Sequence, residues 1–82
     1  MTEQSTMGRF LAALRKEKGL TQQHTAEKLG VSNKAVSRWE RDETAPDISL
    51  LPEIAALFGV SCDELLGGGR IFKSRDQDNN VQ

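Results

Sequence analysis

The stretch TQQHTAEKLGVSNKAVSRWER, residues 21–41, decides the fold of this chain. Thr21 and Ser32 are favoured N-cap residues, and Gly30 suits the left-handed conformation that ends a helix. These signals predict a helix of about eight residues that ends at Gly30 and a second helix over residues 33 to 40 or 41. A three-residue turn that contains glycine makes the two helices cross steeply. The stretch therefore predicts a helix-turn-helix unit.

The second of these helices has two different faces. At about 100° per residue, Ala35, Val36 and Trp39 share one arc, which we expect to pack in the core rather than stack on a base. The opposite arc is polar and cationic and has no carboxylate; its members are Asn33, Lys34, Ser37, Arg38 and Arg41. The helix is about 13 Å long, close to the roughly 12 Å width of a B-DNA major groove. The outer arc therefore predicts contact with DNA.

Side-chain chemistry predicts the role of each residue on this surface. Asn33 can bond to both N6 and N7 of adenine, whereas Lys34 or Arg38 can donate to O6 and N7 of guanine. The start of the preceding helix offers unpaired N–H groups and a partial positive charge, which suit a phosphate. We expect base contacts from Asn33, Lys34, Ser37 and Arg38, with Ser37 also near the phosphates, and phosphate contacts from Gln22, Gln23, Ser32 and Arg41.

An amphipathic helix is predicted before this unit. Apolar residues recur at i, i+3, i+4 and i+7 in Met7, Phe10, Leu11 and Leu14, which indicates a helix over about residues 6–18. Its basic last turn complements the helix dipole, and Gly19 ends it.

Two more helices are predicted after the unit. The first is capped by Ser49 rather than Asp47, because Pro52 is tolerated only in the first turn of a helix. The second starts at a capping box of Ser61 and Glu64. The fold class is all-α, a compact five-helix domain over residues 7–67, with a flexible N-terminus at 1–6 and a flexible or dimer-associated tail at 68–82.

The net charge of −1 conceals an asymmetry along the chain. Residues 1–41 carry eight basic residues (Lys and Arg) and four acidic residues (Asp and Glu), which give a net charge of +4. Residues 42–82 carry three basic and eight acidic residues, which give a net charge of −5. One face of the domain is therefore expected to suit an anionic partner.

Several classes of function lack the residues that they need. One histidine and a lone Cys62 leave no metal site, and the chain has no glycine-rich phosphate loop and no Ser-His-Asp set. We expect no enzyme activity, no cofactor and no small-molecule ligand. Because no secretory signal or membrane span is evident, a cytoplasmic protein that does not bind membranes is expected.

Residues 7–66 resemble the lambda-repressor and Cro-like (XRE-type) family of helix-turn-helix transcriptional regulators. The segments that carry the resemblance are LRKEKGLTQ, AEKLGVSNKAVSRWE and PDISLLPEIAALFGVSCDELL. The resemblance implies a third helix in the major groove of a partly palindromic operator, bound by a homodimer, and it matches Gln22 to a phosphate-contacting glutamine. The function expected is sequence-specific regulation, as a repressor that excludes polymerase. Leu65, Leu66 and the pair Ile71 and Phe72 are the candidates for the dimer surface.

The sequence departs from the family pattern in helix two and after helix three. Thr25 stands where an apolar residue is usual, so we expect helix two to be anchored less firmly. Asp42 replaces a common glycine; aspartate tolerates a left-handed backbone, but Asp42 and Glu43 place negative charge near the expected phosphates. The alternative function is a helix-turn-helix module that binds protein, such as an antitoxin or an anti-repressor.

Overall fold

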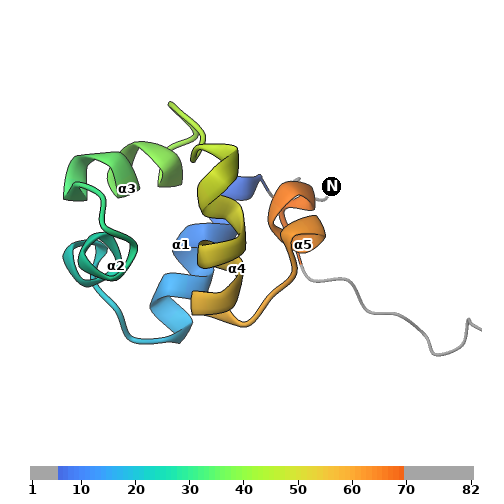
Figure 1. The fold of residues 1–82 in the computed structure, drawn as a ribbon, viewed down its shortest axis with the longest axis horizontal. Helices are drawn as coiled ribbons and strands as arrows, with labels where there is room; N and C mark the ends of the chain where they lie inside the picture. Colours follow the sequence, from blue (N-terminus) through green and yellow to red (C-terminus); the bar gives the residue numbers. More distant parts are fainter. Residues whose placement is uncertain (1–5, 70–82) are drawn as a thin grey trace, which may run out of the picture.

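The structure, a computed structural model, describes residues 6–69. Its elements are α1 (Met7–Glu17), α2 (Gln22–Leu29), α3 (Asn33–Glu40), the 3-10 turn η1 (Ile48–Leu50), α4 (Leu51–Phe58) and α5 (Cys62–Gly67) (Figure 1). This part of the chain contains no strand, and none of its helices has the length and hydropathy needed to span a membrane. The predicted all-α, five-helix class is confirmed. Of the predicted flexible ends, residues 1–5 and 70–82 lie outside the described residues, and with them Ile71 and Phe72.

The ends of the helices follow the capping signals of the sequence at four places. The side-chain oxygens of Thr21 and Ser32 each accept a backbone N–H from the first turn of α2 and α3. Gly30 ends α2 in the left-handed conformation, with φ of 72°. Ser61 and Glu64 form the reciprocal capping box of α5. The turn that joins α2 to α3 is therefore specified at both of its ends by local hydrogen bonds.

The prediction that Ser49 caps the fourth helix is wrong. The Asp47 carboxylate accepts both the backbone N–H and the hydroxyl of Ser49, and this pairing closes the turn η1 ahead of α4. An ionised oxygen is a stronger acceptor than a hydroxyl, so Asp47 takes the capping role. The helix itself begins at Leu51, without a side-chain cap, and Pro52 lies in its first turn as expected.

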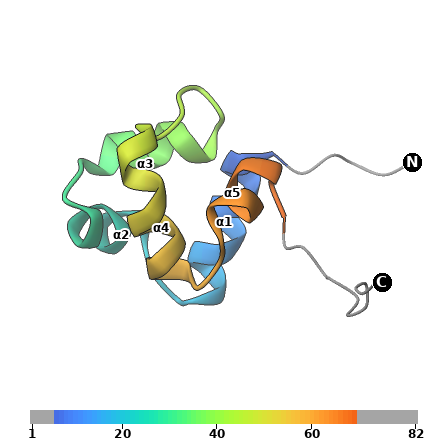
Figure 2. The same cartoon turned by 45° about the vertical axis from the view of Figure 1, so that its right-hand side comes forward.

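The core is formed by apolar side chains from all five helices. Its buried members are Phe10, Leu11, Leu14, Ala26, Leu29, Val36, Trp39, Leu51, Ile54, Ala55, Phe58 and Leu65. In Figures 1 and 2, α2 and α3 lie on one side of α4, and α5 lies on the other side against α1. Val36 and Trp39 are 2% and 7% exposed, which confirms that they pack in the core. Leu65 is fully buried, so it cannot form part of a dimer surface.

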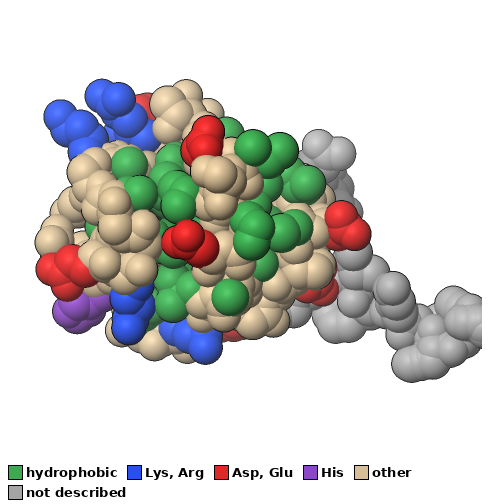
Figure 3. Space-filling view, in the orientation of Figure 1, with side chains coloured by type: hydrophobic (Ala, Val, Ile, Leu, Met, Phe, Trp, Pro, Cys, Tyr) green, Lys and Arg blue, Asp and Glu red, His purple; other side chains and the backbone are tan. Residues whose placement is uncertain are grey.

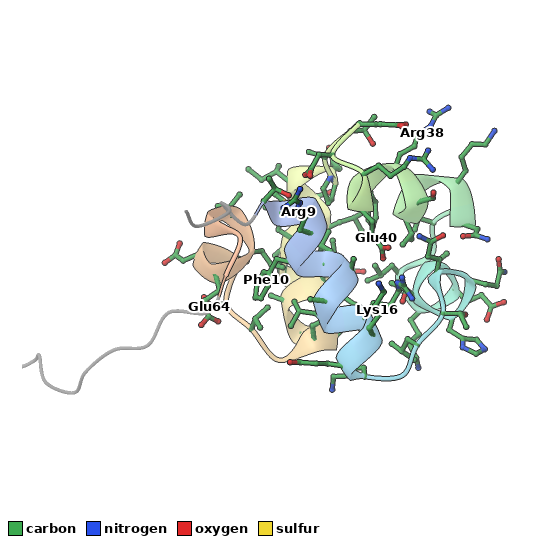
Figure 4. The ribbon with its side chains drawn as sticks, turned by 180° about the vertical axis from the view of Figure 1, so that it is seen from behind. Arg9, Phe10, Lys16, Arg38, Glu40 and Glu64 are labelled. Atoms are coloured by element: carbon green, nitrogen blue, oxygen red, sulfur yellow. The ribbon has the colours of Figure 1, made fainter. Side chains whose placement is uncertain are left out.

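A buried ion pair holds α3 against α1 and α2. The Nε and Nη2 atoms of Arg15 donate to the two carboxylate oxygens of Glu40 at 2.6 and 3.1 Å, and the side-chain amide of Gln22 donates to Glu40 at 3.0 Å. The third guanidinium nitrogen donates to the carbonyl of Leu20 at 2.9 Å. The side chains of Arg15 and Glu40 are 14% and 8% exposed, and Figure 4 shows Glu40 directed from α3 toward the body of the domain. Arg15 therefore does more than complement the dipole of α1.

A second contact ties the loop after α3 to the start of α1. Asp42 has a φ of 60°, the left-handed conformation expected for it. Its carboxylate accepts the backbone N–H of Gly8 at 3.0 Å and the hydroxyl of Thr6, the N-cap of α1, at 2.6 Å. A Cβ at Gly8 would lie 2.3 Å from the carbonyl oxygen of Trp39. The close approach of the two segments therefore requires glycine at this position.

Thr25 is a buried polar residue of α2. Its side chain is 3% exposed, and its hydroxyl donates to the carbonyl of Thr21 at 3.0 Å. That carbonyl also accepts the backbone N–H of Thr25 at 3.0 Å, so it would keep a partner if the hydroxyl were removed.

We expect the substitution Arg15→Met to lower the free energy of unfolding by about 3 kcal/mol, because it leaves the carboxylate of Glu40 buried without a cation. Adding Glu40→Met should recover most of this loss, since no charge then remains unpaired. Chemical denaturation measures both effects. Arg41→Met is the matched control: it removes the same side chain from the exposed pair with Glu43 and should leave the free energy of unfolding nearly unchanged, because solvent screens an exposed ion pair. Equal losses in Arg15→Met and Arg41→Met would contradict the role of burial.

Thr25→Val should raise the free energy of unfolding by roughly 0.5–1 kcal/mol, because a methyl group replaces a buried hydroxyl and leaves no orphaned acceptor. The same change at Thr21 removes the cap of α2 and should lower stability by about 1 kcal/mol. Thermal unfolding followed by circular dichroism compares the two variants. A lower melting temperature in Thr25→Val would show that the hydroxyl stabilises the core.

Candidate nucleic-acid interface

An open hollow lies between the start of α2 and the outer face of α3. It has a volume of about 450 Å³, and the residues that line it are Gln22, Asn33, Lys34, Ser37 and Arg41. All five are among the residues expected to contact DNA. The crossing of α2 and α3, set by the capped turn between them, brings these side chains from two helices to one surface.

The outer face of α3 is exposed along its length. Asn33, Lys34, Arg38 and Arg41 are exposed, and Ser37 is half-buried. Figure 3 shows Lys and Arg side chains projecting from the end of the molecule that α3 occupies in Figure 1. Arg38 points away from the body of the domain (Figure 4). The face predicted to be polar and cationic therefore meets solvent, while Val36 and Trp39 anchor the opposite face in the core.

The side chains expected at phosphates already have partners within the domain. Gln22 gives one amide hydrogen to Glu40 and keeps a second hydrogen and an acceptor oxygen. Gln23 donates to Glu27 at 3.0 Å on the exposed surface of α2. The oxygen of Ser32 accepts the backbone N–H of Ala35, which leaves its hydroxyl proton available to an acceptor. Gln22 is thus held in place from the interior, whereas Gln23 must exchange a partner to reach a phosphate.

Arg41 takes part in an exposed ion pair at the end of α3. Its Nε and Nη2 atoms donate to the two oxygens of Glu43 at 2.9 and 3.2 Å, and its Nη1 atom donates to the hydroxyl of Ser37 at 2.9 Å. The hydrogen bond from Arg41 lowers the pKa of Glu43, and the nearby charge of Arg38 lowers this pKa further. Glu43 is therefore ionised at neutral pH, and it neutralises one of the cations on this face.

The two acidic residues that follow α3 lie in different environments. The Asp42 carboxylate is bonded to the amino end of α1, whereas the Glu43 carboxylate lies beside Arg41 on the surface. A helix N-terminus carries a partial positive charge and unpaired N–H groups, which attract the carboxylate of Asp42. Of the two negative charges that the sequence places near the expected phosphates, Glu43 alone pairs with a side chain of the candidate interface.

The residues that hold this surface in position were not predicted from the sequence. Glu40 lies between the core arc and the outer arc of α3, and Arg15 was assigned to the dipole of α1. One signal was present in the sequence, because Glu40 is the single carboxylate of a helix that is otherwise cationic and apolar. Its partner, 25 positions earlier in the chain, could not be found by spacing within one helix.

A family model described as helix-turn-helix matches residues 11–65 of the chain. The HTH-type transcriptional regulator ImmR of Bacillus subtilis (strain 168) is 37% identical over 73 residues, which cover 89% of this chain and 58% of ImmR. The chain therefore spans less than two thirds of the length of this relative.

Solved structures of DNA complexes share the fold. The P22 c2 repressor bound to a synthetic operator superposes with a TM-score of 0.74 at 38% identity, and the match covers 78% of this chain and 97% of that one. SinR of Bacillus subtilis, described as the master regulator for biofilm formation and solved in complex with DNA, gives a TM-score of 0.66 at 34% identity, with 73% and 97% covered. Because the family model, this relative and these structures all match it, the chain belongs to the helix-turn-helix family, in its lambda-repressor/Cro-like (XRE-type) branch of transcriptional regulators.

Proposed function

We propose that this protein is a sequence-specific DNA-binding transcriptional regulator that represses by occupying an operator as a homodimer. The observation that carries the proposal is the exposed outer face of α3, which continues into the hollow at the start of α2. Five residues of two helices line this hollow, and each has a side chain that can bond to a base edge or a phosphate.

The dimensions of α3 suit the major groove. Its eight residues span about 12 Å at roughly 1.5 Å per residue, and the groove of B-DNA is about 12 Å wide. In this arrangement Asn33 bonds to an adenine, Lys34 and Arg38 donate to guanines, and Ser37 lies between base edges and backbone. Gln22, Gln23, Ser32 and Arg41 contact the phosphates on either side, which fixes the register of the helix.

The two structural neighbours support DNA as the partner, because the P22 c2 repressor was solved in complex with an operator and SinR in complex with DNA. By analogy with these complexes, α3 of this chain carries the sequence readout. The proposed activity requires no catalytic group, cofactor or small-molecule ligand, and a regulator of this kind works in the cytoplasm, where bacterial and phage operators are read.

Two copies are needed for useful specificity, since one short helix contacts few base pairs. Hydrophobic side chains gather on the face over α4 and α5 (Figure 3). Among the described residues, the exposed large hydrophobic side chains are those of Ile48 and Leu66, at 78% and 60%. Contiguous exposed apolar patches mark surfaces that bind protein. We place the dimer contact at Leu66, which is exposed, whereas the other candidate of α5, Leu65, is buried.

Selection of bound duplexes from a random pool should return a palindrome with half-sites about one helical turn apart. Asn33→Ala should relax the preference at one position of each half-site, because each bidentate base contact contributes about 1–3 kcal/mol of discrimination. Arg38→Ala should abolish the shift of the selected duplex in a gel. Gln23→Ala is the matched control, and it should weaken binding equally for all sequences.

Leu66→Asp should convert the bound species on the palindrome from two copies to one, measured by sedimentation. Ala13→Asp, at an exposed position of α1, tests whether added charge alone has this effect. A domain that shifts no duplex at low salt would contradict the proposal and favour the alternative, a module that binds protein.

A further inference from the structure

Arg41 presents to Glu43 the same group of donors that it would present to a phosphate. The contact uses two guanidinium nitrogens and both carboxylate oxygens, at 2.9 and 3.2 Å. Arginine binds carboxylates and phosphates in this same bidentate geometry. Because both partners occupy one set of donors, Arg41 cannot hold Glu43 and a phosphate in this way at once.

The pair also engages a second residue of the interface. The Nη1 atom of Arg41 donates to the hydroxyl of Ser37 at 2.9 Å, and both residues line the hollow beside α3. The position that Arg41 holds in the unbound protein therefore fixes the orientation of the Ser37 hydroxyl as well. The side chains of Arg41 and Glu43 are 56% and 51% exposed, so they can separate without opening the core.

We propose that Glu43 competes with DNA within the same chain. Its carboxylate occupies the guanidinium of Arg41, the group that would bind a phosphate, until a DNA phosphate displaces it. This inference rests on the proposed function of the same surface. Displacement moves the guanidinium from the carboxylate to the phosphate and leaves the Glu43 carboxylate hydrated near the DNA backbone. Every complex that uses Arg41 must first break its ion pair with Glu43. The favourable electrostatic free energy of binding is therefore smaller, and binding to DNA of any sequence is weakened. Base contacts, which are made only on the operator, then contribute a larger share of the affinity.

Asp42 does not act in this way, although it is the neighbouring carboxylate. Both of its oxygens are bonded to the amino end of α1, through Gly8 and Thr6. Its removal would disturb the packing of α1 on the loop after α3. Glu43 has no such contact with another helix among the hydrogen bonds of the described residues, so its charge can be removed with the fold intact.

A double-mutant cycle tests the competition directly. Binding of the full chain to a mixed-sequence duplex of about two helical turns is measured by fluorescence anisotropy at low salt for the wild type, Glu43→Gln, Arg41→Ala and the double variant. Glu43→Gln should tighten binding about threefold or more, the effect of roughly one phosphate contact. In the Arg41→Ala background the same substitution should change the affinity little, because no donor remains to compete for.

Asp63→Asn is the control for net charge, since it removes one exposed negative charge from α5, which packs on α1 and α4. It should have a smaller effect than Glu43→Gln, and the same effect in both backgrounds. An equal gain from Glu43→Gln with and without Arg41 would overturn the competition in favour of general repulsion. No gain, while the wild type binds the duplex, would overturn it and leave the proposed function standing. A wild type that does not bind at low salt would overturn both.

Discussion

The ion pair between the Glu40 carboxylate and Arg15 is the interaction on which the geometry of the candidate interface depends. The carboxylate lies at the end of α3, and it accepts hydrogen bonds from Arg15 of α1 and from Gln22 of α2. A nearly buried carboxylate is costly unless it is paired, so its partners restrict how α3 can rotate and slide on the other two helices. Apolar contacts from Val36 and Trp39 hold the helix on the core but specify its rotation less strictly.

The carboxylates around the end of α3 have two kinds of role. Some stabilise the fold, and one lies on the surface proposed to bind DNA. Glu40 and Asp42 bond to groups of α1 and so join α3 and its following loop to that helix, whereas Glu43 pairs with Arg41 on the surface. Three carboxylates within four positions of the sequence therefore have three different partners. This division explains how a chain with a net charge of −1 can present a cationic surface, because two of the negative charges nearest to α3 are bonded within the fold.

Local signals allowed much of the fold and the surface to be predicted from the sequence. The caps at Thr21, Ser32 and Ser61 and the apolar spacing of α3 depend on residues within a few positions of one another, and these predictions are confirmed. The start of α4 was predicted wrongly because Asp47 and Ser49 compete for one role at the same place. The pairing of Arg15 with Glu40 joins residues far apart in the chain, so no local pattern could identify it. The contact residues themselves stay predictions.

We propose that the outer face of α3 and the start of α2, held in place through Glu40, form the surface that binds DNA. Backbone amide NMR of the protein titrated with its selected operator tests this most directly, because each residue reports its own change. We expect the largest shifts at residues 22–23 and 32–43, with small changes along the core-facing side of α4. Shifts confined to α4 and α5, with α3 unchanged, would contradict it.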